Sequence, residues 1–460
     1  MLVSAAKITE HIASIDGRAG RLIRPARLAL CVAMALGAAV PQAASAAAAP
    51  VHTAPSAYGE TLDSFYTARG DRPLWFGGSG AAPQILIDLL RSARADDLDP
   101  DLYRPRNLDR AVRAARSGNP ADITRADRML SQAFVAYVRD LKRTPNVDMI
   151  WVDAQLRPSA PSPRQLLESA DAAPSLESYL ADMPWMNPIY AGLRQALANG
   201  ADNNRMERDL LRLNLERARA LPAATGKYVI VNATAARLTM YEDGQIVDTM
   251  RVVVGKPVHS TPMMAALIRF TSLHPFWNVP ADLAAERVAP NVVKSGPAYL
   301  KAKGYQLLSS WDANAKVISP DTVDWASVAA GRTEVRLRQL PGPSNAMGKM
   351  KFMFPNAQGI YLHDTPEKNL LGEDLRMFSG GCVRLEDAPR LAKWLYNGKA
   401  PATKSARPEQ RIDLPEPVPV FLTYLTAMPS GGEITYLPDV YDRDSAALAA
   451  LDGAQSFASH

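Results

Sequence analysis

Apolar residues in the first half of the chain recur at helical spacing. One apolar face covers residues 85–90 and its run is broken at Asp99-Pro100, and further faces cover 129–138 and 189–197. Acidic pairs, metal-ligand clusters and glycine-rich phosphate loops are missing from this half of the sequence. We therefore expect a helical scaffold here.

From Tyr228 onward the hydrophobic period changes to two residues. Alternation at 228–232 and 237–241, the turn at Asp243-Gly244 and a returning run at 246–254 predict a β-hairpin. Further strands are expected at 265–272, 334–340, 351–354, 360–362, 417–425 and 434–436. A short helix, capped by Asp387-Ala388-Pro389, is expected through Leu395. The second half is therefore predicted to be mostly β.

Two segments depart from these patterns. Residues 201–220 mix charges with leucines, which predicts a solvated helix packed on one side that joins the two halves. Residues 280–345 are irregular, with helical stretches and the tryptophans Trp311 and Trp325. An insertion of this length, directly before the strands that carry a histidine and a cysteine, is a candidate lid.

The N-terminus is typical of a secretory signal. Four arginines between positions 18 and 27 precede an apolar run at 28–40, which is too short to span a bilayer, and Ala44-Ser45-Ala46 offers small residues for cleavage. We expect export to the periplasm, with membrane contact only through this signal segment. An uncleaved membrane anchor, or a true start later than Met1, are the alternatives.

Removal of this segment changes the charge and the cysteine count. Residues 1–46 carry five Lys/Arg and two Asp/Glu, so a whole-chain charge of +5 falls to about +2. No basic tract with interleaved aromatics follows, and a nucleic-acid partner is not expected.

Cys31 is lost with the segment, which leaves Cys382 without an intrachain disulfide partner. An unpaired thiol in an oxidising compartment indicates a functional role.

Cys382 lies directly after two glycines and nineteen residues after His363. A thiol attacks carbonyls as the thiolate, and His363, at the end of the apolar run 360–362, can accept its proton. The glycines allow a tight bend and present backbone N–H groups, such as that of Gly381, to an oxyanion. Arg384 would face the same side as Cys382 in an extended strand, as a candidate for stabilising the thiolate, binding a substrate carboxylate or holding the loop.

Two other histidines of the exported part do not suggest further chemistry. His259 and His274 lie among strand residues with no neighbouring ligand set, so we expect both to be non-catalytic. No His/Cys spacing matches a zinc site, and no metal is expected.

His363-Asp364-Thr365-Pro366, followed by Ser379-Gly380-Gly381-Cys382-Val383-Arg384, resembles the signature of the YkuD-type L,D-transpeptidases. Segments that further resemble the large YcbB-like branch of that family are Asn214-Leu215-Glu216-Arg217-Ala218-Arg219, Val254-Gly255-Lys256-Pro257, Pro275-Phe276-Trp277-Asn278-Val279-Pro280 and Pro73-Leu74-Trp75. The resemblance covers nearly all of the exported chain. It implies an α+β fold, with a helical N-terminal scaffold domain followed by a mostly β catalytic domain that carries a lid insertion.

The resemblance also implies residue roles, without any cofactor or metal. Cys382 matches the nucleophile, His363 the base and the backbone carbonyl of Asp364 the third member of the triad. The Gly381 N–H, with that of Cys382, matches the oxyanion hole, and Arg384 matches a supporting position. Substrate-binding positions are expected at Ser379, Gly380, Tyr361, Trp277 and Asn278.

The partners implied are peptidoglycan stem peptides, as acyl donor and acceptor, and carbapenem-type inhibitors that acylate the cysteine. The product implied is a 3–3 cross-link between diaminopimelate residues. Alternatives are 1–3 cross-linking, L,D-carboxypeptidase activity or D-amino-acid exchange, a sortase-like, papain-like or NlpC-type thiol enzyme, and an inactive wall-binding scaffold. Two departures from the branch are a missing peptidoglycan-binding domain and Gly380 in place of the commoner serine.

The predicted organisation is a signal peptide at 1–46, a linker at 47–57, a helical scaffold domain at 58–200, a connecting helix at 201–225, a catalytic domain at 226–445 with a lid insertion at about 280–345, and a C-terminal tail at 446–460.

Overall fold

The computed structural model describes residues 58–200, 204–402, 405 and 407–450. The predicted signal peptide, the predicted linker and residues 451–460 of the predicted tail lie outside the described residues. Within the described ranges, no helix has both the length and the apolar character needed to cross a membrane.

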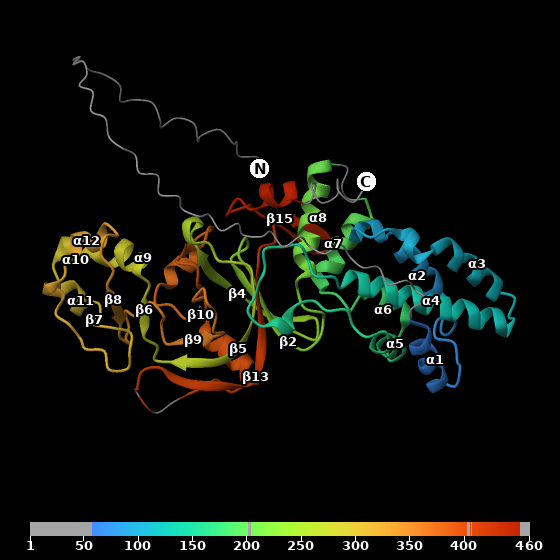
Figure 1. Ribbon diagram of the computed structural model, residues 1–460, viewed down its shortest axis with the longest axis horizontal. Helices are drawn as coiled ribbons and strands as arrows, with labels where there is room; N and C mark the ends of the chain where they lie inside the picture. Colours follow the sequence, from blue (N-terminus) through green and yellow to red (C-terminus); the bar gives the residue numbers. More distant parts are fainter. Residues whose placement is uncertain (1–57, 201–203, 403–404, 406, 451–460) are drawn as a thin grey trace, which may run out of the picture. The chain divides into compact units, whose positions relative to one another are not determined.

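The first half of the described chain is helical (Figure 1). Its helices are α1 (Gly59–Ala68), α2 (Ala82–Arg91), α3 (Pro105–Ala115), α4 (Pro120–Leu141), α5 (Pro163–Asp171), α6 (Leu176–Asp182) and α7 (Pro188–Ala198). Helix α8 (Arg205–Arg219) follows and leads into the strands.

Proline occupies the first position of α3, α4, α5 and α7. Its fixed φ suits a helix start, and its missing N–H removes a donor that has no partner there in any case. Asn119 caps α4 by accepting a hydrogen bond from the Ala121 N–H at 2.9 Å. Ser162 and Gln165 form a reciprocal capping box on α5. Many prolines of this half therefore begin helices rather than break them.

The second half is mostly β, so the predicted fold class is confirmed. Its strands are β2 (Lys227–Asn232), β3 (Arg237–Glu242), β4 (Gln245–Gly255), β5 (Met264–Leu273), β6 (Trp277–Val279), β7 (Tyr305–Leu308), β8 (Arg336–Gln339), β9 (Met350–Met353), β10 (Leu362–His363), β11 (Met377–Ser379), β12 (Val383–Leu385), β13 (Gln410–Thr423), β14 (Ala427–Ser430) and β15 (Glu433–Tyr436). Helices α9 (Ala281–Leu283), α10 (Ala289–Ser295), α11 (Ala298–Ala302), α12 (Trp325–Ala329) and α13 (Ala388–Leu395) lie between them.

The main sheet closes on itself. Its order is β5-β13-β2-β3-β4-β12-β10-β9, and β9 pairs with β5 as well as with β10. Closure leaves no open edge along this path, so backbone groups are paired on both sides. The short strand β1 (Ile150–Trp151) runs parallel to β5 from the scaffold side, and Asp153 pairs with Arg269 there at 2.5 Å.

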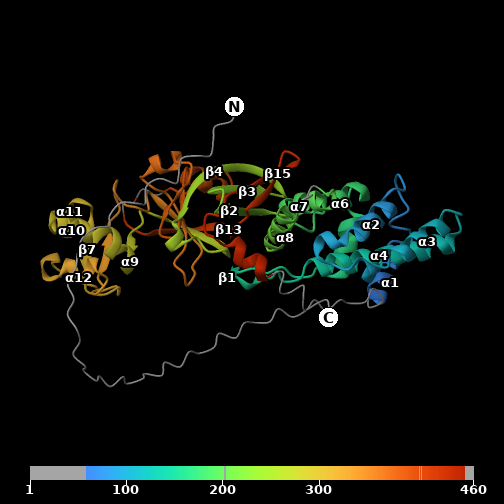
Figure 2. The ribbon, with the colours of Figure 1, turned by 90° about the horizontal axis from the view of Figure 1, so that it is seen from above.

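Scaffold and barrel share one hydrophobic core, which includes Phe134 of α4, Leu211 of α8 and Val229 of β2. The insertion between β5 and β9 has a second core of its own, built on the three-stranded sheet β6-β8-β7. Figures 1 and 2 both show helices α10, α11 and α12 gathered around β7 in this insertion. The segment predicted to be an irregular lid is thus a small packed unit.

The prediction of a solvated connecting helix is wrong for the C-terminal half of α8. Glu216 is only 2% exposed and its carboxylate binds Arg143 at 2.7 Å and Arg219 at 3.0 Å. Arg219 also donates to the backbone oxygens of Leu141 at 2.8 Å and Asp96 at 3.1 Å. Charged side chains of a surface helix normally face water. Here they are buried and paired, because Arg143 and backbone oxygens of the scaffold lie against α8.

Replacing Glu216 with Gln is expected to lower the free energy of unfolding by about 3–5 kcal/mol, because Arg219 would be buried without a counter-charge. Burial alone would raise the pKa of Glu216, but Arg219 and Arg143 lower it from 4.5 to about 2. This stabilisation is full above about pH 4.5 and is lost as the pH falls towards 2. Urea titrations at several pH values measure both effects.

The matched control is Glu207→Gln, in the first turn of the same helix and partly exposed. Loss of a carboxylate there is expected to cost less than about 1 kcal/mol. Equal losses in the two variants would contradict the proposed importance of the buried pair.

Candidate active site

Strands β10 and β12 bring the predicted site residues together. They run parallel, with His363 opposite Arg384, and the Val383 N–H donates to the Tyr361 oxygen at 3.1 Å. Alternate residues of a strand share a face. Tyr361 and His363 therefore lie on the same face as Cys382 and Arg384, and the rings of Tyr361 and His363 have centroids 5.8 Å apart.

A backbone carbonyl orients the imidazole. His363 is 1% exposed, and its Nδ1 lies 2.5 Å from the carbonyl oxygen of Asp364. A carbonyl oxygen only accepts hydrogen bonds, so Nδ1 carries the proton. The lone pair is then on Nε2, which leaves that nitrogen as the proton acceptor.

The Asp364 side chain anchors this carbonyl. Its carboxylate accepts a hydrogen bond from the Lys349 N–H at 2.9 Å and binds the Lys368 ammonium at 2.9 Å. These two groups outweigh burial and lower the pKa of the Asp364 carboxyl. Lys368 also donates to the Leu385 oxygen at 3.0 Å, which ties the loop after His363 to β12.

Side-chain oxygens hold the loop that precedes Cys382. The Ser379 hydroxyl donates to the Cys382 oxygen at 2.6 Å. The Thr261 hydroxyl donates to the Gly381 oxygen at 2.8 Å and accepts from the Gly255 N–H at 2.9 Å. Gly381 adopts a φ of +110°, which an L side chain rarely tolerates.

The two predicted oxyanion donors differ in the structure. The Gly381 N–H already donates to the Ser379 hydroxyl at 3.1 Å, so it is not free to bind a substrate oxygen. No group in the described part of the chain accepts a hydrogen bond from the Cys382 N–H. The donor available to a substrate is therefore the N–H of the cysteine itself.

Thiol and imidazole are both held neutral at rest. Burial raises the pKa of the Cys382 thiol from 9.0 to about 11, against the opposing effects of hydrogen bonding to Tyr361 and the charge of Arg384. Burial, helped by Arg384, lowers the pKa of His363 from 6.5 to about 3, against the hydrogen bond to Asp364. A preformed thiolate–imidazolium pair is thus disfavoured before substrate binds.

Arg384 is 6% exposed and pairs with Glu367. Its charge lowers the pKa of the thiol and disfavours protonation of His363. Glu367 was not predicted as a site residue, although its place four residues after His363 in a charged loop was the available signal. Thr261 was also missed as a loop anchor, since nothing local links it to Gly381.

The insertion directly contacts the loop that precedes Cys382. A Cβ added at Gly380 would lie 2.8 Å from Leu283 Cδ1, so the glycine lets helix α9 approach closely. Arg287 donates to the Phe378 oxygen at 2.6 Å. Glu286 binds Lys256 at 2.5 Å and lies 2.9 Å from His259 Nε2. The YcbB-like branch more commonly has a serine at position 380. The glycine found here therefore lies at the place where α9 packs against the loop.

Other predicted residues lie elsewhere. Trp277 is 7% exposed in the core of the insertion, near Tyr305, and Tyr361 of the site packs against the same core, so the role of Trp277 in substrate binding stays a prediction. Asn278 is exposed on β6 opposite Arg338. His274 has a backbone role, with its N–H bonded to the Lys349 oxygen at 3.1 Å. Across the described residues, no His, Cys, Asp and Glu side chains gather into a group able to hold a metal ion.

Two family models match the chain. The L,D-transpeptidase catalytic domain (YkuD) matches residues 226–413, and the scaffold domain matches residues 60–197. The protein therefore contains an L,D-transpeptidase catalytic domain preceded by a scaffold domain. A peptidoglycan-binding domain is not found, and residues 198–225 between the two matches are too few to form one.

Among known proteins, the chain is similar to "Putative L,D-transpeptidase" of Haemophilus influenzae, with 28% identity over 83% of this chain and 78% of the relative. Similar solved structures include an L,D-transpeptidase from Mycobacterium smegmatis (13% identity, 44% of this chain and 63% of that one, TM-score 0.21). Another is L,D-transpeptidase 3 from Mycobacterium tuberculosis in complex with a faropenem-derived adduct (14% identity, 45% and 65%, TM-score 0.22). The chain covers less than two thirds of each of these two solved chains.

The raised thiol pKa predicts slow alkylation of the free enzyme. With a pKa of about 11 rather than 9.0, Cys382 should react with iodoacetamide at pH 8 about a hundredfold more slowly than an unperturbed thiol, and the rate should rise with pH up to about 11. Mass spectrometry of the peptide that contains Cys382 measures this rate. Arg384→Gln should slow it further and the exposed control Arg407→Gln should not; alkylation faster than a free thiol would contradict the raised pKa.

Gly381→Ala is expected to lower the free energy of unfolding by about 1–3 kcal/mol, because φ is +110° and the new Cβ would lie 3.1 Å from Ile360 Cδ1. Denaturant titration measures the loss. Gly372→Ala is the control, since its Cβ would meet nothing within 4 Å and its φ is not positive. A variant at position 381 that is as stable as this control would show that the loop conformation is unstrained.

Proposed function

We propose that the protein is a peptidoglycan L,D-transpeptidase in which Cys382 is the nucleophile and His363 the base. The observation that carries this proposal is the hydrogen bond from His363 Nδ1–H to the Asp364 carbonyl, on the strand face shared with Cys382. This hydrogen bond leaves Nε2 of His363 as the nitrogen that can accept a proton. The catalytic-domain match supplies the class of reaction.

The first half-reaction acylates the thiol. The Cys382 proton passes to His363 Nε2 as sulfur attacks the carbonyl carbon of an L-centre in the donor stem, the third residue, diaminopimelate. The Cys382 N–H donates to the oxygen that becomes negative. The C–N bond to the following D-residue then breaks, and that residue leaves as an amine with the proton from His363. A thioester on Cys382 remains.

The second half-reaction transfers the acyl group. The side-chain amine of diaminopimelate on a second stem attacks the thioester carbon, and His363 accepts its proton. The C–S bond breaks and the thiolate regains a proton, so no cofactor is consumed. Arg384 lowers the pKa of the thiol in both halves, which stabilises the thiolate as it forms and as it leaves.

The neutral resting pair fits this order of events. Proton transfer between groups with pKa values of about 11 and about 3 is unfavourable in the free enzyme. Donation from the Cys382 N–H to the developing oxyanion stabilises the negative charge as sulfur attacks, so that proton transfer to His363 accompanies attack. Thiolate formation is thereby coupled to substrate binding.

The 3–3 product is our first candidate. In that product, diaminopimelate supplies both the acyl group of the donor stem and the amine of the acceptor stem. A 1–3 product, an L,D-carboxypeptidase reaction with water or an exchange with a D-amino acid would use the same acyl-enzyme. Carbapenem-type inhibitors are expected to acylate Cys382 in the same way. Action in the periplasm requires the export signal predicted at residues 1–46.

Cys382→Ala is expected to abolish cross-link formation, since no other thiol of the exported chain can carry the acyl group. Purified muropeptides are incubated with enzyme and the products analysed by mass spectrometry, which also distinguishes 3–3 dimers, 1–3 dimers and trimmed peptides. An unchanged melting temperature of the variant shows that the fold is retained. Cross-linking by a folded Cys382→Ala protein would refute the mechanism.

A further inference from the structure

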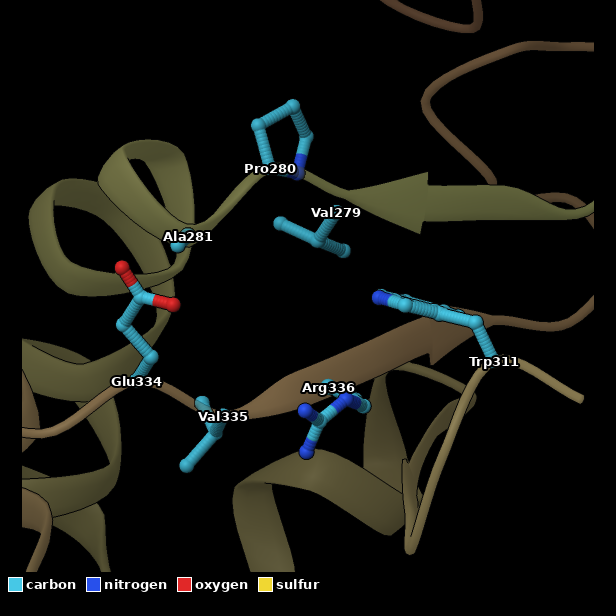
Figure 3. Close-up of a pocket in the computed structure, with 7 residues that line it drawn as sticks. All are labelled: Val279, Pro280, Ala281, Trp311, Glu334, Val335 and Arg336. Atoms are coloured by element: carbon cyan, nitrogen blue, oxygen red, sulfur yellow. The ribbon is translucent and has the colours of Figure 1, made fainter. Parts of the chain in front are cut away.

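The insertion contains a hollow of about 240 Å³ that is separate from the residues around Cys382 (Figure 3). We call it the insertion hollow. Its lining consists of the apolar residues Val279, Pro280, Ala281 and Val335, the indole of Trp311, and the charged side chains of Glu334 and Arg336. None of these residues has a part in the proposed acyl transfer.

The hollow forms where two strands separate. Strand β6 pairs with β8 up to Val279, which lies opposite Leu337. At Pro280, which has no N–H to donate, the chain leaves the ladder and turns into α9. The start of β8 runs on past this point, so the side chains of Glu334 and Arg336 border a space that no strand fills.

The polar groups around this space have no side-chain partners among the described residues. Trp311 is 50% exposed, which is unusual for so large an apolar side chain. Figure 3 shows the indole of Trp311 directed towards Val279, and Glu334 and Arg336 line the same hollow from the start of β8. In the part of the chain that the structure describes, no other side chain hydrogen bonds or pairs with any of these three groups.

The mixture of groups favours a ligand that both donates and accepts hydrogen bonds. A guanidinium only donates hydrogen bonds and a carboxylate only accepts them, whereas a hydroxyl does both. A ligand with a single charge would meet one like charge, at Glu334 or at Arg336, and a zwitterionic free peptide is the alternative that the test below distinguishes. A neutral ring that carries hydroxyls can satisfy both, and its C–H face can pack against the indole of Trp311.

We propose that the insertion hollow binds a sugar ring of the peptidoglycan glycan strand. This proposal rests on the proposed function and extends it to substrate recruitment. Sites for drug-sized ligands have volumes of ~300–1,000 Å³. The hollow is slightly smaller, so it suits one sugar ring rather than several rings of a glycan strand. A glycan contact in the catalytic half would also supply wall binding where no peptidoglycan-binding domain is found.

The hollow is connected to the nucleophile loop through α9. Ala281, which lines the hollow, begins the helix whose Leu283 packs against Gly380. A sugar bound at one end of α9 would therefore be attached to the same element that covers the loop before Cys382. The glycan would position the stem peptide that it carries.

Trp311→Ala tests the proposal with two donors, a disaccharide-linked tetrapeptide and the same tetrapeptide without sugar. We expect kcat/KM on the sugar-bearing donor to fall about tenfold through KM, with kcat unchanged, and no change on the free peptide. Arg336→Gln should act in the same direction. Val293→Ala, an exposed apolar residue of α10, is the control and should change neither donor.

Binding is measured separately by calorimetry, using folded Cys382→Ala protein and peptide-free glycan chains. Binding that disappears when Trp311→Ala is added supports the proposal. Equal loss of activity on both donors, unchanged activity on both, or binding of the free tetrapeptide at this hollow would overturn it. A wild-type protein inactive on both donors would refute the proposed function, while the calorimetry would still decide whether the hollow binds glycan.

Discussion

The parallel pairing of β10 with β12 is the contact on which the site depends. His363 lies on β10 and Cys382 directly precedes β12, and the observed register places them with Arg384 on a common face. A shift of one residue would turn His363 to the opposite face. Strand β10 has two residues, and its position is fixed by β9 on one side and β12 on the other. Closure of the barrel therefore determines the chemistry.

Much of the fold could be predicted because its causes are local. Period-two alternation predicted β2, β3 and β4, and the Asp243-Gly244 turn between β3 and β4. Closure through the β9–β5 pair could not be predicted, since no short-range pattern encodes which distant strands meet. The buried half of α8 was missed for the same reason. Arg143, the partner of Glu216, is far away in the sequence, and a charged helix normally faces water.

The candidate site, like the fold, could be predicted only in part. Residue types and spacing were sufficient to select Cys382, His363 and Arg384, which the structure brings together. Contacts between segments could not be read from the sequence, and they include Glu367 with Arg384 and Leu283 against Gly380. The hydrogen bond from the Gly381 N–H to the Ser379 hydroxyl could not be predicted from the sequence either, because it depends on where that hydroxyl points.

The raised pKa of Cys382 also affects the durability of the protein. The thiolate, rather than the thiol, is the form that peroxides convert to sulfenic acid. With a pKa of about 11, almost none of the resting protein carries a thiolate at neutral pH. Burial thus makes the cysteine a poor target for oxidants between turnovers. In the proposed mechanism, the thiolate forms as a bound stem peptide is attacked, when that peptide also covers the sulfur.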